Sequence, residues 1–179
     1  MNAALHEAIY RKYIAPTERP AGKYVGAELE YPLVNLARRP VDIPAVQEVV
    51  RGFAGRFHFT GQCKDDNGNP YSLTEPVTGD NLSFDCSFNT LELSFGKEES
   101  IAVLYVRFVR YFEDLQAHFR RIGHLLTGLG IHPYYKYNDY VPIANDRYRM
   151  LYHHLQSYPE YPERQFHGIP HFGMLAAAS

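Results

Sequence analysis

Two glutamates separated by one residue are the feature of this sequence whose charge and spacing best indicate chemistry. Glu28 and Glu30 lie in the largely apolar segment YVGAELEYPLV. On an extended strand, residues i and i+2 point to the same face about 7 Å apart, so the two carboxylates repel each other unless a cation lies between them. A solvated surface pair also fits the pattern, but the apolar neighbours make unpaired charge costly there. Both interpretations stay open from the residues alone.

A second acidic segment, LSFDCSFNTLELSFG, carries Asp85 and, seven positions later, Glu92. If the leucines on either side of Glu92 face the core, Glu92 lies on the polar face of a sheet. A strand pairing that brings Glu92 beside Glu28 and Glu30 would make an oxygen-only site, which is the kind that Mg²⁺ prefers. The sequence therefore predicts a magnesium site built from two strands.

Phosphate-binding glycine loops do not occur in the sequence, which has neither GxxxxGK[ST] nor GxGxxG. An ATP-dependent chain of this kind would hold phosphates through metal ions and basic side chains. Lys136, Arg147 and Arg149, in or beside an aromatic segment, are the candidates, with solvated surface cations as the alternative. The histidines in HH and HGIPH do not have the geometry of a transition-metal site.

The bulk composition is that of a soluble globular protein, with 45% hydrophobic and 21% charged residues and a net charge of -2. This balance argues against general nucleic-acid binding. Only two cysteines occur, Cys63 and Cys86, and their spacing supports neither structural zinc nor a disulfide scaffold. No apolar run approaches the roughly 18 residues that span a bilayer, so we expect a cytoplasmic protein without membrane association.

The elements that must position the acidic residues follow from periodicity and turn signals. Strands come early in the chain and long helices late, which favours a single α+β domain with a mainly antiparallel sheet. Two turn clusters, DDNGNP and PVTGD, bracket a short YSLTE strand. The other expected elements are a helix at 2–14, a strand at 23–36 with Pro32 at an edge or bulge, a helix at 44–53, one or two strands at 81–94, a helix at 98–129 ending at Gly128 and Gly130, and a final helix capped by Asp146.

Three segments together resemble the glutamate-cysteine ligase family of carboxylate-amine ligases. GAELE resembles its ExE strand, and LSFDCSFNTLELSFG resembles its second acidic strand. GLGIHPYYKYNDYVPIANDRYRMLYHHL is similar to a stretch of the plant and proteobacterial branch, in which a Gly-x-x-Pro turn, an Asp, a Pro and an Arg-Tyr-x-x-Met helix follow in that order. The matches span position 26 to about 173, so residues 1–179 are expected to form the amino-terminal portion of such a catalytic domain.

The resemblance implies a glutamine-synthetase-like fold, incomplete in this chain, with a curved antiparallel sheet and helices packed on one side. The concave face would hold Mg²⁺, ATP and glutamate. ATP would phosphorylate the γ-carboxylate of glutamate, and the cysteine amine would attack the acyl phosphate, which is the first step of glutathione biosynthesis. No nucleic acid is an expected partner, and the oligomeric state is left open.

The family's site residues can be carried over to matching positions of this sequence. Asp85 would support the site or position the incoming amine, whereas Tyr148 matches the helix motif without an assigned role. Glu28, Glu30 and Glu92 would bind Mg²⁺. Together with the basic candidates chosen above by their position, the full assignment adds Asp85 and Arg147 for catalysis and Lys136 and Arg149 for the nucleotide.

The sequence also departs from the family pattern. A strand with a Gln-Val-Asn or His-x-Asn pattern, followed by further Glu and Arg residues of the active site, is expected after the final FGMLAAAS. We therefore expect a part of a longer enzyme, which on its own binds at most part of the substrate set. Two alternatives stay open: a related ligase that uses another amine, and a non-catalytic binding or assembly module.

Overall fold

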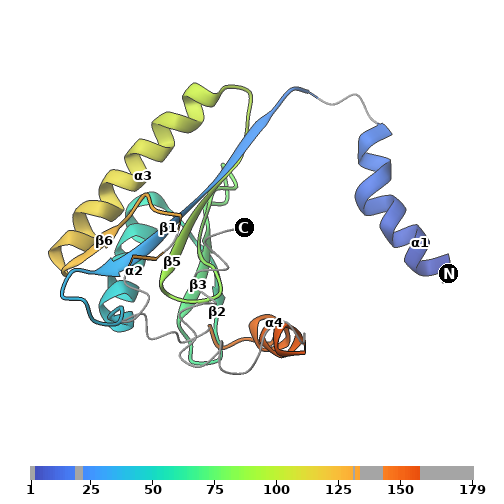
Figure 1. Cartoon of the computed structure of the whole chain (residues 1–179). Coiled ribbons are helices and arrows are strands. Elements are labelled where there is room, and N and C mark those ends of the chain that lie inside the picture. Colours follow the sequence, from blue (N-terminus) through green and yellow to red (C-terminus); the bar gives the residue numbers. More distant parts are fainter. Residues whose placement is uncertain (1–2, 19–21, 131, 134–142, 158–179) are drawn as a thin grey trace.

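The fold is built on one six-stranded antiparallel sheet with the strand order β2-β3-β4-β5-β1-β6 (Figure 1). The structure, a computed structural model, describes residues 3–18, 22–130, 132–133 and 143–157. The strands are β1 Val25–Asn35, β2 Gly61–Lys64, β3 Pro70–Thr74, β4 Asn81–Phe84, β5 Thr90–Glu98 and β6 His124–Leu126. The predicted α+β class and antiparallel sheet are confirmed, as are the two turn clusters that separate β2, β3 and β4.

Two long helices cover the apolar face of this sheet. α2 (Ile43–Phe57) begins where the Asp42 carboxylate accepts the backbone N–H of Ala45 at 3.1 Å, with a proline in its first turn. α3 (Ile101–Arg121) begins at Ser100, whose hydroxyl accepts the N–H of Ala102. The predicted helix at 44–53 is therefore confirmed, four residues longer at its end.

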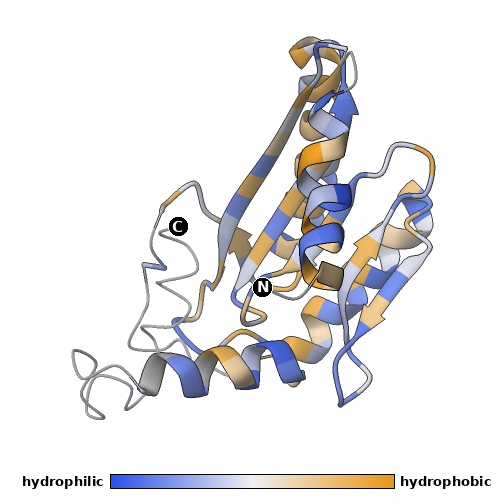
Figure 2. Ribbon diagram, turned by 90° about the vertical axis from the view of Figure 1, so that its right-hand side faces the viewer, coloured by the Kyte–Doolittle hydropathy of each residue, from blue (hydrophilic) through white to orange (hydrophobic). Residues whose placement is uncertain are grey.

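Side chains alternate along the central strands between this helical layer and the opposite face. Figure 2 shows the strands banded by hydropathy. Leu91, Leu93 and Phe95 of β5 are buried, and the residues between them are only partly buried. Leu115 and Phe119 of α3 are fully buried against the same core. Burying a side chain of this size stabilises the fold by roughly 1.5–3 kcal/mol, so this face of the sheet is fixed by packing.

The amino-terminal helix stands apart from the sheet (Figure 1). α1 (Ala3–Ile9) continues as a π-helical turn η1 (Tyr10–Ile14) and a 3-10 turn η2 (Ala15–Glu18). The helix predicted at 2–14 is confirmed over its described residues. None of its residues is buried, although Leu5 is apolar.

The long helix ends earlier than the sequence predicted. α3 stops at Arg121, and Gly123 adopts a φ of 71°, which favours glycine. The next residues form β6, whose Leu126 N–H and C=O both bond to the side chain of Gln116. The apolar run after Gly123 also fits a helical pattern, because a short apolar strand and a buried helical turn have similar sequences.

Pro32 and Asp146 also differ from expectation. β1 lies between β5 and β6, so Pro32 is not on an edge strand, and the bulge in β1 falls between Val25 and Ala27. Pro32 lies where β1 changes partner from β5 to β6, which tolerates the missing N–H. α4 (Asp146–Gln156) is capped by Asn145, whose side-chain oxygen accepts the N–H of Tyr148 at 3.0 Å.

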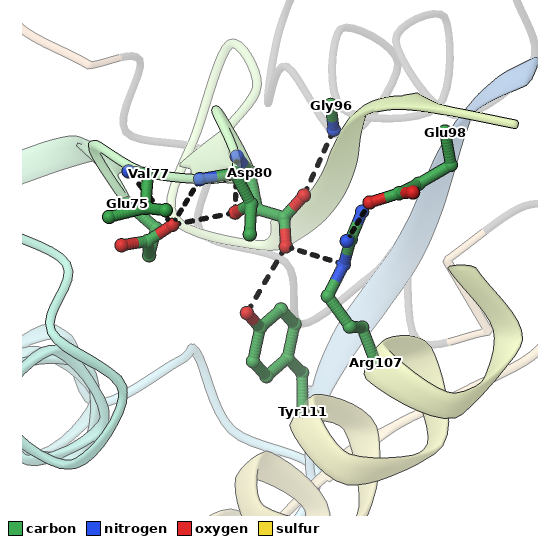
Figure 3. A network of polar contacts seen from close by, with 8 residues as sticks. Glu75, Val77, Asp80, Gly96, Glu98, Arg107 and Tyr111 are labelled. Atoms are coloured by element: carbon green, nitrogen blue, oxygen red, sulfur yellow. Dashed lines mark hydrogen bonds and ion pairs between the residues drawn. The ribbon is translucent and has the colours of Figure 1, made fainter. Parts of the chain in front are cut away.

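A buried ionic network fastens the β3–β4 turn to β5 and α3 (Figure 3). Asp80 is 1% exposed and accepts hydrogen bonds from Gly96 N–H and the Tyr111 hydroxyl. The Arg107 guanidinium lies 3.1 Å from Asp80 and also pairs with Glu98. Burial, with the charge of Asp80, raises the pKa of Tyr111 to about 12. The network therefore joins the β3–β4 turn, β5 and α3 on the helical side of the sheet.

Candidate functional site

Two rows of polar side chains cross the open face of the sheet. The register places Glu30 opposite Glu92 and Glu28 opposite Ser94 on the neighbouring strands β1 and β5. The pairing continues across β4 and β3, because Glu92 and Ser94 face Ser83 and Asn81 in turn. The first row is Ser72, Ser83, Glu92 and Glu30, and the second is Thr74, Asn81, Ser94 and Glu28.

The predicted juxtaposition of the three glutamates is confirmed by this register. Directly opposed residues of an antiparallel pair have Cβ atoms about 4.5–5.5 Å apart. The carboxylates of Glu30 and Glu92 are therefore close neighbours, and Glu28 lies two residues along the same strand. Two sequence-distant segments thus concentrate negative charge on one patch.

Glu30 is a member of this group whose pKa is shifted by its surroundings. Its pKa is raised above the usual range, first by burial and then by the charges of Asp85, Glu92 and Glu28. Asp85 therefore belongs to the same cluster, as the second acidic segment predicted. We name Glu28, Glu30, Asp85 and Glu92 the acidic cluster. Its mutual repulsion would fall if a cation bound there.

The acidic cluster opens into a cavity of about 330 Å³. Three of its members, Glu28, Asp85 and Glu92, line this cavity. The opposite wall comes from α4, which contributes Arg147 and Tyr148. Arg147 is exposed and is the one basic residue among the described residues that line the cavity, with its guanidinium 5.7 Å from the centre of the Tyr148 ring. The cavity therefore combines several carboxylates with one cation that could bind an anionic group.

Two members of the cluster are held by hydroxyl donors. The Ser94 hydroxyl donates to Oε1 of Glu92, its neighbour two positions away on β5. The Tyr148 hydroxyl donates to Oδ1 of Asp85 at 3.2 Å, and the Cys86 thiol lies 3.5 Å from the same oxygen. Because a hydrogen bond to an ionised group is stronger than one between neutral groups, these contacts fix the orientation of both carboxylates.

The basic residues predicted to bind nucleotide are not gathered in the cavity. Lys136 lies outside the described residues. Arg149 donates to Asp66 and to Asp146, each at 2.6 Å, and it does not line the cavity. Its contacts agree with the alternative of a surface cation, whereas Arg147 lines the cavity and its catalytic role stays a prediction.

Magnesium fits the donor chemistry of the cluster in a limited way. Among the described residues, no group of three or more His, Cys, Asp or Glu side chains is arranged to hold a metal ion. Mg²⁺, however, is usually bound by one or two protein carboxylates together with waters and substrate phosphates. The opposed pair of Glu30 and Glu92 meets that smaller requirement. The magnesium role of Glu28, Glu30 and Glu92 stays a prediction.

Cysteine and histidine do not add a second kind of chemistry to the described part of the chain. Cys63 and Cys86 are free cysteines, as predicted. Burial, and the charge of Asp85, raises the pKa of the Cys86 thiol far above its usual value. A thiol kept protonated in this way is a poor nucleophile. The HGIPH segment lies outside the described residues.

Sequence reasoning missed the polar residues that complete the cavity. Ser72 and Ser83 line it from β3 and β4, and their alternation with apolar neighbours in YSLTE and NLSFD was the available signal. The role of Tyr148 had no such signal, because its bond to Asp85 joins residues 63 positions apart.

Comparison with known proteins adds no family assignment to this geometry. No protein-family model matches the chain, and a search of curated proteins found no match. Within the described residues, none of the helices is long and apolar enough to cross a membrane.

Proposed function

We propose that this chain forms the acidic site of an ATP-dependent carboxylate-amine ligase of the glutamate-cysteine ligase type, on a glutamine-synthetase-like sheet. The observation that carries the proposal is the pairing of Glu30 with Glu92 on the open face of the sheet. The resemblance of both segments to the two acidic strands of that family supports the same conclusion. Glu92 of this pair lines a cavity together with Glu28, Asp85 and Arg147.

The proposed reaction has two steps. An oxygen of the glutamate γ-carboxylate attacks the γ-phosphorus of ATP, and ADP leaves. The ammonium group of cysteine, or of another amine, loses one proton, and its nitrogen then attacks the acyl carbon. Inorganic phosphate leaves, and the nitrogen loses a second proton. The products are a γ-glutamyl amide, ADP and phosphate.

The acidic cluster and Arg147 would have different roles in this reaction. Glu28, Glu30 and Glu92 would hold Mg²⁺, which neutralises charge on the transferred phosphoryl group when it is bound. Asp85 would accept an N–H of the incoming ammonium group. Arg147, the exposed cation of the cavity wall, would bind an anionic group of a substrate. Lys136 and Arg149 remain proposals for the nucleotide.

Thermal unfolding with and without Mg²⁺-ATP tests the proposal. Binding to the folded state raises the midpoint by mass action. We expect a rise for the parent chain and none for the Glu28→Gln, Glu92→Gln double variant. The matched control is Glu113→Gln, which removes an exposed carboxylate on α3 and should keep the parent's rise. Equal midpoints with and without Mg²⁺-ATP in the parent would refute the proposal.

A binding or assembly module is the second candidate. Its support is the amino-terminal helix, whose Leu5, Ile9 and Tyr13 are all exposed on a segment that stands apart from the sheet. Apolar side chains arranged at helical spacing can serve a protein partner. Such a module would be indifferent to Mg²⁺-ATP, so the same unfolding experiment separates the two candidates.

A further inference from the structure

α4 and the short segment before it join two turns of the sheet that are far apart in sequence. The N–H of Asp66, in the β2–β3 turn, donates to the carbonyl of Ala144 at 2.8 Å. The N–H of Ile143 donates to the carbonyl of Cys86, in the β4–β5 turn, at 2.9 Å. Arg149 adds an ion pair to Asp66. The segment therefore fastens the turn that carries Asp85.

That turn adopts an unfavourable backbone conformation. Cys86 has a φ of 58°, in the left-handed region that residues other than glycine, asparagine and aspartate seldom adopt. Strain of this kind persists where the surroundings impose it, and it is often found beside functional groups. Here the strained residue directly follows Asp85, and its own side chain is buried.

Tyr148 is the side chain that connects α4 to the carboxylate itself. It is 4% exposed, it lines the cavity, and its hydroxyl donates to Oδ1 of Asp85. The same hydroxyl accepts the backbone N–H of Cys86, so it also contacts the turn. The backbone bonds of Ile143 and Asp66 fasten the segment without it. The bond to Oδ1 instead sets which way the carboxylate points, and it leaves Oδ2 without a hydrogen bond to the described residues.

We propose that Tyr148 is a positioning residue, which orients the Asp85 carboxylate so that its second oxygen can accept an N–H of the amine substrate. The proposal rests on the ligase function proposed above and adds to it a residue that the family motif left without a role. Tyr148 acts through Asp85 and contacts no reacting atom. The nucleotide and the phosphorylation of glutamate do not depend on its hydroxyl.

The test compares two nucleophiles in the assay of ADP formation from glutamate and Mg²⁺-ATP. L-Cysteine is the amine that Asp85 would have to orient. Hydroxylamine is a small nucleophile that traps the acyl phosphate without being oriented by Asp85. For Tyr148→Phe, which keeps the ring, we expect the KM for L-cysteine to rise about tenfold, as expected for a lost hydrogen bond to a charged group. The kcat, the KM for ATP and the rate with hydroxylamine should not change. Tyr105→Phe, an exposed tyrosine on α3, is the matched control.

A double-mutant cycle separates positioning from a structural role. If Tyr148 acts through Asp85, the Asp85→Asn, Tyr148→Phe double variant should have the same KM for L-cysteine as Asp85→Asn alone. Additive effects, or a Tyr148→Phe variant that loses hydroxylamine and L-cysteine turnover equally, would overturn the proposal. If the parent chain turns over and Tyr148→Phe has the same KM for L-cysteine, the positioning role is overturned and the ligase function is not. A parent chain that forms no ADP would overturn this inference, and one that also fails to bind Mg²⁺-ATP would refute the ligase function with it.

Discussion

Glu30→Gln should make the free chain more stable and, at the same time, abolish its stabilisation by Mg²⁺-ATP. The pKa of Glu30 is raised by burial and by three neighbouring carboxylates. A group whose folded-state pKa is raised binds its proton more tightly in the folded state. The free energy of unfolding therefore falls as pH rises from the ordinary glutamate pKa to the raised one. Above the raised pKa the penalty is complete, and a neutral side chain of similar shape removes it.

The size of the gain follows from the strand register. Glu30 lies directly opposite Glu92, and cross-strand pairs of this kind change stability by roughly 0.2–1 kcal/mol. We expect the gain for Glu30→Gln at pH 7 to be about 0.5–1 kcal/mol, equivalent to a midpoint rise of roughly 1–4 °C in a chain of this length. Below about pH 4, where glutamate is protonated in both states, the gain should vanish.

Binding of Mg²⁺-ATP should make the parent more stable than the Glu30→Gln variant, which reverses their order without ligand. At a ligand concentration of 100 times the Kd, the parent gains about 2.7 kcal/mol by mass action. The variant, with one ligand of the proposed ion removed, should gain little. Urea unfolding at pH 4 and pH 7, with and without Mg²⁺-ATP, measures the free energy of unfolding of each protein under all four conditions. Glu113→Gln controls for the loss of an exposed carboxylate. A Glu30→Gln variant that is less stable than the parent without ligand would refute the repulsion argument. An unchanged gain from Mg²⁺-ATP would refute the metal role of Glu30.

Three further predictions concern the layer that supports the cluster. Asp80→Asn leaves the partly buried Arg107 without its inner partner, so urea unfolding should give a loss of about 3 kcal/mol, whereas an equal midpoint would mean the network is not coupled to stability. Gly96→Ala places a Cβ 1.9 Å from the Thr78 carbonyl oxygen, so the urea midpoint should fall by the equivalent of about 1–3 kcal/mol, unless the β3–β4 turn can move away. Burial lowers the pKa of His132, so the free energy of unfolding should fall as pH drops below about 6.5, and His132→Gln should flatten that slope.

The sequence predicted the site's acidic half because strand periodicity and side-chain chemistry agreed there. Glu28 and Glu30 alternate with apolar residues, as Glu92 does, so each strand has one apolar and one acidic face. Two such strands can bury their apolar faces together only if their acidic faces also meet. That Glu28, Glu30 and Glu92 share one face follows from that constraint, whereas the register that pairs Glu30 with Glu92 does not.

The elements that the sequence missed depend on contacts between distant residues. β6 forms because the Gln116 side chain and β1 offer hydrogen-bond partners to residues after Gly123, and neither is visible in the local apolar pattern. α4 carries a recognisable motif, but the direction in which Tyr148 points is set by its hydroxyl bond to Asp85. Local periodicity predicts which face of an element is buried, and it does not predict which other element covers that face.

The costs within the acidic cluster argue that it is more than a solvated surface. Burial and then repulsion from the neighbouring carboxylates raise the pKa of Glu30, and the turn that presents Asp85 contains Cys86 in a left-handed backbone conformation. A fold selected for stability alone could remove the repulsion with a single Glu-to-Gln change. Ser94 and Tyr148 instead donate hydrogen bonds to the carboxylates of Glu92 and Asp85. Donors that hold neighbouring carboxylates in fixed positions are what a cation-binding site needs.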